Sequence, residues 1–259
     1  MSTALITGAT AGIGAAFARR LAAAGDDLIL VARNDKRLAD SASEMKEVYG
    51  VEVRTIAADL TRDGDCATVA DAAAEVDLLV NNAGMGLSSG FTANALADEE
   101  RQLDLNVRAI LRLTHAALPA MRERRRGAIV NVSSVAGFGP TMPGSTYNAS
   151  KAWVTGFSES MAPIARRRGV SIMALCPGFV RTEFHERAGI SIDGIPQWMW
   201  LDADYVVETA MRDLVRGKVV CVPSLTYKVL VSVIRHLPNR LLTQVTQRME
   251  AISRRGNIT

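Results

Sequence analysis

Several features that mark particular classes of protein are scarce in this chain of 259 residues. It has three cysteines, Cys66, Cys176 and Cys221, which are widely separated and odd in number. That usage favours a reducing compartment and offers no disulfide framework, so we interpret the thiols as small buried apolar side chains. The net charge is only +3, and the chain as a whole is therefore not an obvious nucleic-acid-binding protein.

Long apolar runs and linkers are missing as well. The N-terminus enters a strand-like run without a basic start or an apolar stretch of signal length. The most apolar run near the C-terminus, residues 229–234, is far shorter than the roughly 20 residues of a membrane-spanning helix. No linker, repeat or low-complexity segment divides the chain. These absences predict a cytoplasmic protein with a single domain and no integral membrane span.

Short apolar runs alternate with longer helical patterns along the chain. Strands are predicted at 4–7, 27–32, 51–57, 77–81, 128–133, 171–176 and 219–222, and helices near 12–24, 35–49, 62–74, 98–125, 148–168 and 204–216. Most strand runs are continuously hydrophobic, which is typical of strands buried on both faces. The alternation predicts an α/β fold of the doubly wound Rossmann type, with about seven parallel strands and helices on both faces of the sheet.

A glycine-rich segment follows the first strand directly and opens the first helix. Gly8, Gly12 and Gly14 have the spacing G-x3-G-x-G in TGATAGIG, residues 7–14. Such a turn brings backbone N–H groups and a helix N-terminus against a pyrophosphate, and a Cβ would block that approach. A plain strand-to-helix turn is the alternative, but the place of the segment after the first strand of an alternating chain favours a dinucleotide.

The end of the second strand indicates which dinucleotide binds. An acidic residue about 20 residues after the glycine loop would hold the adenosine ribose 2′-hydroxyl, and here the position carries Arg33. A guanidinium suits a 2′-phosphate, because it donates bidentate, charge-assisted hydrogen bonds. The sequence therefore predicts NADP(H) in preference to NAD(H), by at least about tenfold or about 1.4 kcal/mol. A solvated arginine at a helix start is the alternative.

Tyr147 and Lys151 are four residues apart in STYNASKAW, residues 145–153. On a helix they would share a face, and the ammonium would lower the pKa of the phenol toward working pH. Such a tyrosine is a usable general acid or base. Ser134 closes the fifth predicted strand, whose end borders the ligand crevice of a parallel sheet. Taken alone, the three residues fit a chance helical pair and an ordinary cap equally well.

Together these segments resemble the short-chain dehydrogenases/reductases over about residues 3–222, nearly the full length. The matches, in the order and spacing of that family, are TGATAGIG (7–14), ADL (58–60), NNAG (81–84), Asn106 in LDLNV, Ser134, YNASK (147–151) and PGFVRT (177–182). The resemblance implies hydride transfer between a nicotinamide and a carbonyl or secondary alcohol. Many NADP-dependent members have a basic residue in the glycine loop where this chain has Ala11, so the NADP(H) prediction rests on Arg33 alone.

The resemblance also implies a role for each matching residue. Tyr147 is expected to protonate the carbonyl oxygen and Ser134 to steady it. Lys151 is expected to lower the tyrosine pKa and bind the nicotinamide ribose, and Asn106 to hold a water in a proton relay to Lys151. The expected cofactor-binding residues are Gly8, Thr10, Ala11, Gly12, Ile13, Gly14, Arg33, Asp59, Leu60, Asn82, Ala83, Gly84, Tyr147, Lys151, Pro177, Gly178 and Thr182. No metal ligand is expected.

Two elaborations extend the predicted domain of residues 1–222. An insertion at about 183–203 is rich in apolar residues, which favours a lid over a hydrophobic substrate; a segment packed on the body or an oligomer contact is the alternative. Residues 223–259 form a basic extension with a net charge of +5, which leaves −2 for the first 222 residues. It is predicted to form two amphipathic helices broken at Pro238, as a flap, an oligomer surface or a peripheral membrane contact.

The substrate is predicted to be a hydrophobic, acyl- or lipid-like carbonyl compound, such as a 3-oxoacyl thioester or a ketone. Reductases of steroids, sugars or small ketones are the alternatives within the family. A protein of another class, a non-catalytic dinucleotide sensor, would not need Asn106, Ser134, Tyr147 and Lys151 together. A homodimer or homotetramer is expected, because many relatives associate through the helices near 98–125 and 148–168.

Overall fold

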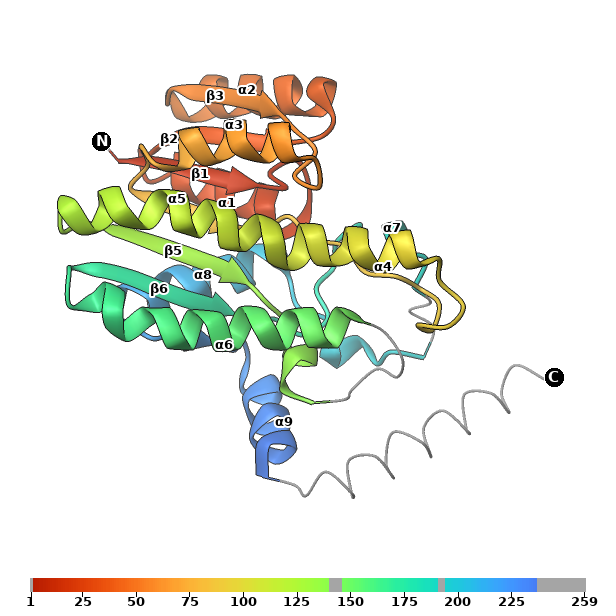
Figure 1. Ribbon diagram of the computed structural model, residues 1–259. Coiled ribbons are helices and arrows are strands. Elements are labelled where there is room, and N and C mark those ends of the chain that lie inside the picture. The colour runs from red at the N-terminus through yellow and green to blue at the C-terminus, as the bar shows by residue number, and fades with distance from the viewer. Residues whose placement is uncertain (1, 140–145, 191–193, 237–259) are drawn as a thin grey trace.

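The computed structural model describes residues 2–139, 146–190 and 194–236, which form a seven-stranded sheet in the order β3-β2-β1-β4-β5-β6-β7 (Figure 1). The strands are β1 (Thr3–Thr7), β2 (Asp27–Ala32), β3 (Val53–Ala57), β4 (Leu78–Asn81), β5 (Gly127–Val132), β6 (Val170–Leu175) and β7 (Val220–Cys221). Every neighbouring pair is parallel. The strand order reverses direction between β1 and β4, and ligands bind beyond the carboxyl ends of strands at such a point.

The helices cover both faces of the sheet, so the predicted doubly wound fold is confirmed. They are α1 (Gly12–Ala22), α2 (Asp35–Tyr49), α3 (Asp63–Ala73), α4 (Leu96–Leu103), α5 (Ala109–Glu123), α6 (Thr146–Arg166), α7 (Phe184–Arg187), α8 (Ala203–Val215) and α9 (Leu225–His236). Short 3₁₀ turns occur at η2 (Val135–Phe138) and η3 (Gln197–Met199). The first predicted tail helix corresponds to α9, and the second lies outside the described residues.

Two apolar cores lie on opposite faces of the sheet. One joins α1, α2, α8 and α9 to one set of strand side chains, and the other joins α3, α5 and α6 to the alternate set. In β1, for example, Ile6 contributes to the first core and Leu5 to the second, because successive side chains of a strand point to opposite faces. This burial explains the continuously hydrophobic strand runs. The thiols of all three cysteines are buried, as the composition predicted.

The segment predicted as one helix over 98–125 is interrupted. A π-helical turn, η1 (Asp104–Arg108), separates α4 from α5. Such turns insert a residue into the α-helical ladder and are frequent at functional sites. Asn106 stands in the middle of this turn and is fully buried. The sequence pattern over 98–125 predicts one continuous helix and does not reveal this interruption.

Within the described residues, no helix combines the length and the apolar character needed to cross a bilayer.

Candidate active site at the carboxyl ends of the strands

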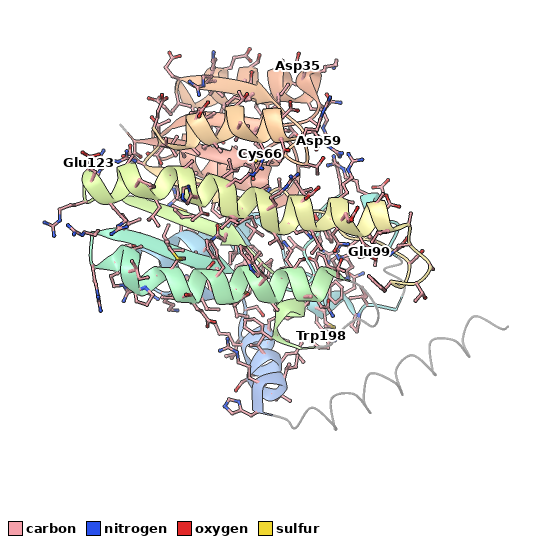
Figure 2. All side chains as sticks on the ribbon, viewed as in Figure 1. Asp35, Asp59, Cys66, Glu99, Glu123 and Trp198 are labelled. Carbon is pink, nitrogen blue, oxygen red and sulfur yellow. The ribbon has the colours of Figure 1, made fainter. Side chains whose placement is uncertain are left out.

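The sequence-predicted site residues come together at one edge of the sheet. The glycine loop follows β1, Arg33 follows β2, Asp59 follows β3, and the segments that begin at 82, 133 and 176 follow β4, β5 and β6. Figure 2 shows Asp59 and Glu99 toward this edge, whereas Glu123 lies at the opposite edge, where the strands begin. The parallel topology alone explains this gathering, since parallel strands all end on the same side.

The glycine loop has the backbone shape that the sequence predicted. Gly8 and Gly12 have φ values of +66° and +52°, a region that favours glycine. A Cβ on Gly14 would lie 2.2 Å from the Gly8 carbonyl oxygen. Ala11, the N-cap residue of α1, has no side chain that can accept from the first N–H groups of the helix. The loop therefore offers backbone donors and a helix N-terminus, which fit the pyrophosphate of a dinucleotide.

Thr7 and Asn82 join the glycine loop to the loop that follows β4. The Thr7 hydroxyl oxygen accepts from the backbone N–H groups of Asn82 and Ala83, both at 2.9 Å. The Asn82 amide donates to the carbonyl oxygens of Thr7, at 2.8 Å, and Gly8, at 3.2 Å. The two walls of the crevice are thus fixed to each other before any ligand binds. Thr7 was not singled out from the sequence, because its hydroxyl acts on partners about 75 residues away.

Positive charge surrounds the end of the crevice near β2 and β3. Arg33 is exposed. Burial opposes a low pKa at Asp59, but hydrogen bonds from Thr61 and the charges of Arg101 and Arg33 hold that pKa below its usual value. Arg33 and Asp59, which the resemblance assigned to the 2′-phosphate and the adenine, therefore lie close enough to interact. The guanidinium of Arg33 remains accessible to an anion.

Arg37, on α2, adds a second cation near this end of the crevice. It donates to the Thr10 carbonyl oxygen at 3.1 Å and forms a two-pronged ion pair with Glu183, at 2.8 and 3.1 Å. A hydrogen bond to Glu183 raises the pKa of Arg37. Thr182, beside Glu183, packs on the glycine loop, since a Cβ on Gly12 would lie 2.7 Å from its methyl group. The segment that follows β6 therefore rests against the loop that follows β1.

Ser134, Tyr147 and Lys151 meet where β5 ends and α6 begins. Lys151 is only 4% exposed, its ammonium donates to the Val132 carbonyl oxygen at 2.9 Å, and it lies 5.7 Å from the centre of the Tyr147 ring. Tyr147 is hydrogen-bonded to the Ser134 side chain, and the Ser134 hydroxyl oxygen accepts from the Ala136 N–H at 3.1 Å. The helical spacing thus brings together the phenol, the ammonium and the hydroxyl, as predicted.

The two titratable groups of this cluster have strongly perturbed acidities. Burial raises the pKa of Tyr147 to about 12, although the hydrogen bond from Ser134 lowers it. Burial also lowers the pKa of Lys151 to about 8. Burial thus raises the phenol pKa in the protein by itself, and the lowering of that pKa which the resemblance assigns to Lys151 stays a prediction. The phenol is consequently protonated at neutral pH and able to donate.

Asn106 lies beside Lys151, at the π-helical turn. Its amide donates to the Met85 carbonyl oxygen at 2.8 Å and accepts from the Met85 N–H at 2.9 Å, and its nitrogen lies 3.3 Å from the Ser150 hydroxyl. A Cβ on Gly84 would lie 3.2 Å from the Asn106 oxygen and 3.5 Å from the Lys151 ammonium. Asn106 thereby fixes the loop after β4. The water that the resemblance assigns to Asn106 stays a prediction.

Aromatic side chains from the insertion cover the phenol. The Phe184 ring lies 5.9 Å from the Tyr147 ring and packs on Gly86, where a Cβ would lie 3.2 Å from it. His185 lies among the rings of Phe179, Phe184 and Trp200, at centroid distances of 5.3–5.6 Å. Burial lowers the pKa of His185, and its buried Nδ1 has no hydrogen-bond partner among the described residues. The segment is thus an aromatic cover directly over the reactive groups.

Glu99 and Tyr227 also support the site, although neither was predicted. Glu99, on α4, is 2% exposed and accepts from Thr146, the first residue of α6, at 2.5 Å. Tyr227, on α9, is 1% exposed. A polar residue in an otherwise apolar helix face is a weak sequence signal for burial. Thr146 lies 47 residues from Glu99, and the partners of Tyr227 lie 28 and 48 residues away, so the sequence alone cannot identify these contacts.

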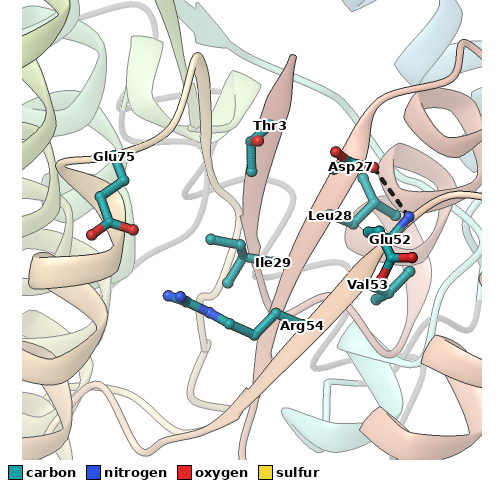
Figure 3. Close-up of a pocket in the computed structure, with 8 residues that line it drawn as sticks. All are labelled: Thr3, Asp27, Leu28, Ile29, Glu52, Val53, Arg54 and Glu75. Atoms are coloured by element: carbon teal, nitrogen blue, oxygen red, sulfur yellow. Dashed lines mark hydrogen bonds between the residues drawn. The ribbon is translucent and has the colours of Figure 1, made fainter. Parts of the chain in front are cut away.

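A surface hollow elsewhere does not belong to this site. It lies at the beginning of β1, β2 and β3 and is lined by Thr3, Asp27, Leu28, Ile29, Glu52, Val53, Arg54 and Glu75 (Figure 3). The Glu52 N–H donates to the Asp27 carboxylate across its rim, at 3.1 Å. None of the predicted site residues lines it. Among the described residues, no cluster of three histidine, cysteine or acidic side chains has the arrangement of a metal site.

A doubly wound parallel sheet, a glycine loop after β1 and a Ser–Tyr–Lys cluster with a buried ammonium after β5 together define a nicotinamide-dinucleotide-dependent oxidoreductase. The family profile described as short chain dehydrogenase matches residues 2–191. The chain belongs to the short-chain dehydrogenase/reductase family, whose members act on alcohol and carbonyl groups of small molecules.

Solved structures of this family match over almost the whole chain. A short-chain dehydrogenase from Sphingobium yanoikuyae in complex with NADPH is 36% identical, with a TM-score of 0.83, and 98% of this chain and 96% of that chain are covered. The bulky-bulky ketone specific alcohol dehydrogenase from Comamonas testosteroni is 31% identical, with a TM-score of 0.79 and coverage of 98% and 94%.

Among curated relatives, the very-long-chain 3-oxoacyl-CoA reductase of Anas platyrhynchos is 34% identical, over 73% of this chain and 63% of that protein. These proteins share the fold and the family, but the names of the last two describe different carbonyl substrates.

Proposed function

We propose that this protein is an NADPH-dependent ketoreductase for bulky hydrophobic carbonyl compounds. The observation that carries the proposal is the cluster at the end of β5, where the Ser134 side chain is hydrogen-bonded to a phenol held over a buried ammonium. A sensor that only binds a dinucleotide has no use for this arrangement. Cytoplasmic location and formation of a homodimer or homotetramer stay predictions of the sequence.

Each residue of the cluster has a distinct chemical task. A bound nicotinamide dinucleotide supplies the hydride. Tyr147 donates its phenolic proton to the carbonyl oxygen as a general acid, and with its pKa raised to about 12 it still holds that proton at neutral pH. Ser134 donates a hydrogen bond to the same oxygen as its negative charge develops. Lys151 holds a positive charge beneath the phenol and stabilises the phenolate that remains after proton transfer.

A preference for NADPH is favoured by the charge around the adenosine end of the crevice. Arg33 is exposed there, and its charge acts on Asp59. Because a 2′-phosphate presents oxygens to a guanidinium and a 2′-hydroxyl does not, we expect at least about a tenfold higher kcat/KM with NADPH than with NADH. The relative from Sphingobium yanoikuyae is in complex with NADPH. Equal kcat/KM values for the two cofactors would contradict the preference.

The character of the substrate is inferred from the cover over Tyr147. Phe184, Phe179 and Trp200 present aromatic faces around His185, and apolar surface of this kind favours a hydrophobic substrate. The names of two relatives, a bulky ketone dehydrogenase and a long-chain oxoacyl reductase, describe substrates of the same character. Ketones with two large apolar substituents and 3-oxoacyl thioesters are therefore the substrates to test, with sugars and small ketones as comparison.

The decisive experiment replaces the phenol. Tyr147→Phe keeps the ring that packs on Phe184 and removes only the hydroxyl, so NADPH binding, followed by fluorescence titration, should stay within about twofold of wild type. Carbonyl reduction, followed as NADPH oxidation, should fall by at least about a thousandfold, since the proton donor is lost. Trp153→Phe on the same helix serves as control. A variant that retains substantial reductase activity would refute the assigned role.

The substrate panel separates the competing functions. Wild-type protein that oxidises NADPH with large apolar ketones or thioesters supports the proposal, and a clear preference for sugars or small ketones would replace the substrate class. Protein that binds NADPH tightly but reduces no member of the panel would favour the sensor instead. The panel also requires no knowledge of the physiological substrate.

A further inference from the structure

Tyr227 is the residue of α9 that reaches furthest into the body of the protein. It is 1% exposed and among the largest fully buried side chains. Its ring lies flat on Gly178, where a Cβ would stand 1.9 Å from the ring carbon Cζ and 2.2 Å from both Cε atoms. Any larger residue at 178 would collide with this ring. The glycine in the segment after β6 is therefore required by a helix that lies outside the minimal dehydrogenase domain.

The Tyr227 hydroxyl joins the two ends of the insertion at 183–203. It accepts from the Phe179 N–H at 3.0 Å and donates to the Met199 carbonyl oxygen at 2.8 Å. Phe179 and Leu201 are paired beside it, with the Leu201 N–H donating to the Phe179 carbonyl oxygen at 2.8 Å. The Arg181 N–H donates to the Leu201 carbonyl oxygen at 3.0 Å. These backbone pairs and the hydroxyl form a stem, which we define as residues 179–181 and 199–201.

The position of this stem determines how the insertion meets the site. Thr182, the first residue beyond it, packs on Gly12 of the glycine loop. Phe184, two residues further, lies against the Tyr147 ring. Because the distance along the chain from the stem to these contacts is so short, a shift of the stem displaces both the wall beside the glycine loop and the aromatic cover over the phenol.

The same helix also contacts the other side of the site. A Cβ on Gly139 would lie 2.7 Å from an Ile234 methyl group, and the Arg235 guanidinium lies 4.5 Å from the centre of the Phe138 ring. Phe138 ends η2, the turn that directly follows Ser134. In Figure 1, α9 lies below α6, near the ends of the strands. The helix thus supports both the segment after β5 and the stem after β6.

We propose that α9 braces the active site and that Tyr227 is a positioning residue for the aromatic cover. Its hydroxyl holds the two segments of the stem together, and its ring fixes the position of Gly178 beside the cofactor crevice. The kinetic consequences rest on the proposed ketoreductase function, whereas the structural consequences do not. The tail was predicted to be a flap, an oligomer surface or a membrane contact; this proposal gives residues 225–236 a different role, as a fixed support of the site.

The first test compares Tyr227→Phe with wild type and with Tyr205→Phe, a matched control at an exposed tyrosine of α8. Removal of the hydroxyl leaves the Phe179 N–H and the Met199 carbonyl without this partner. We expect the KM for a bulky ketone to rise about five- to tenfold, while kcat per active site stays within about twofold. A loss confined to kcat, or equal KM values in Tyr227→Phe and wild type, would overturn the positioning role.

A second readout does not depend on catalysis. Arg187, on α7, has a half-exposed side chain and lies within the insertion, so limited trypsin digestion reports how often that segment opens. Cleavage after Arg187 should be at least about fivefold faster in Tyr227→Phe than in wild type or Tyr205→Phe. Equal cleavage rates would refute the brace. If no variant or wild type reduces any ketone, the proposed function fails while the cleavage result still decides this inference.

Gly178→Ala provides an independent variant should Tyr227→Phe fold poorly. Its Cβ would push the ring aside while the hydroxyl remains present. The same acceleration of cleavage after Arg187 is expected, and an unchanged rate in a folded Gly178→Ala protein would contradict the proposed contact.

Discussion

Lys151 should make the stability of this protein depend on pH in a specific way. The residue is 4% exposed, and burial lowers the pKa of its ammonium from 10.5 to about 8. One pKa unit corresponds to about 1.4 kcal/mol, so a change of this size corresponds to about 3 kcal/mol. At neutral pH the folded state is destabilised by this amount, because the charged amine has left water for a buried position where it donates to the Val132 carbonyl oxygen.

The sign follows from the two protonation equilibria. The unfolded chain keeps the Lys151 proton up to about pH 10.5, whereas the folded protein releases it near pH 8. Between these values the unfolded state binds more protons, so the free energy of unfolding rises with pH. Below about pH 8 both states are protonated, and the contribution of Lys151 no longer changes.

The perturbation is Lys151→Met, which keeps the length of the side chain and removes the titrating group. Urea unfolding of both proteins without added cofactor, at pH values from about 7 to about 10, gives the free energy of unfolding for each. The free energy of unfolding of the wild type should rise relative to that of the variant by about 2.5 kcal/mol over this range, mostly above about pH 8. Titration of other groups occurs in both proteins and cancels in the difference. Parallel pH dependences would refute the burial argument.

The same group should limit catalysis at high pH. Because kcat/KM reports the free enzyme, carbonyl reduction should fall about tenfold per pH unit above about pH 8, as the Lys151 ammonium loses its proton. Tyr147, with a pKa of about 12, stays protonated over this range and does not cause the fall. A profile that is flat up to about pH 10 would contradict this assignment.

Two further predictions concern other charged groups. Burial opposes a low pKa at Glu99, but hydrogen bonds from Thr146 and Asn94 hold that pKa below its usual value. Glu99→Gln should therefore lower the free energy of unfolding by about 1–2 kcal/mol at about pH 7. In urea unfolding, the difference between wild type and variant should disappear as the pH falls below about 4.5 and then through the lower pKa that Glu99 has in the folded protein. A difference that persists at low pH would contradict this role of the Glu99 carboxylate. Arg33→Ala should reduce the preference for NADPH, measured as a ratio of kcat/KM values, about tenfold, because the KM for NADPH rises. Lys36→Ala is the control. An unchanged preference in Arg33→Ala would exclude Arg33 as the phosphate ligand.

Much of the fold could be predicted because local residue patterns identify its strands and the ends of its helices. Continuous apolar runs such as DLILVA at 27–32 identify strands buried on both faces. Helix boundaries follow from nearby residues: Asn34 caps α2 by accepting from the Arg37 N–H, and Gly50, with φ of +69°, ends it. Parallel topology then places every loop that follows a strand at one edge. The location of the site therefore needed only the order of the elements.

Contacts between distant segments could not be predicted in the same way. The π-helical turn at Asn106 interrupts a segment that the sequence pattern predicts as one continuous helix. The ion pair between Arg37 and Glu183 joins residues 146 positions apart, and no pattern near either residue indicates its partner. In each case a side chain that has no evident partner in the sequence forms a contact with a distant segment once the chain is folded.

The sequence by itself determined the reaction class, because the glycine loop, Asn106, Ser134, Tyr147 and Lys151 together resemble one enzyme family in order and spacing, whereas the helical spacing alone did not. Only the tertiary structure decided how these groups ionise and what holds their cover in place. Desolvation depends on everything packed around a side chain, which raises the pKa of Tyr147 and lowers that of Lys151. The stem beneath the aromatic cover likewise depends on Tyr227, whose ring meets Gly178 only after α9 has docked.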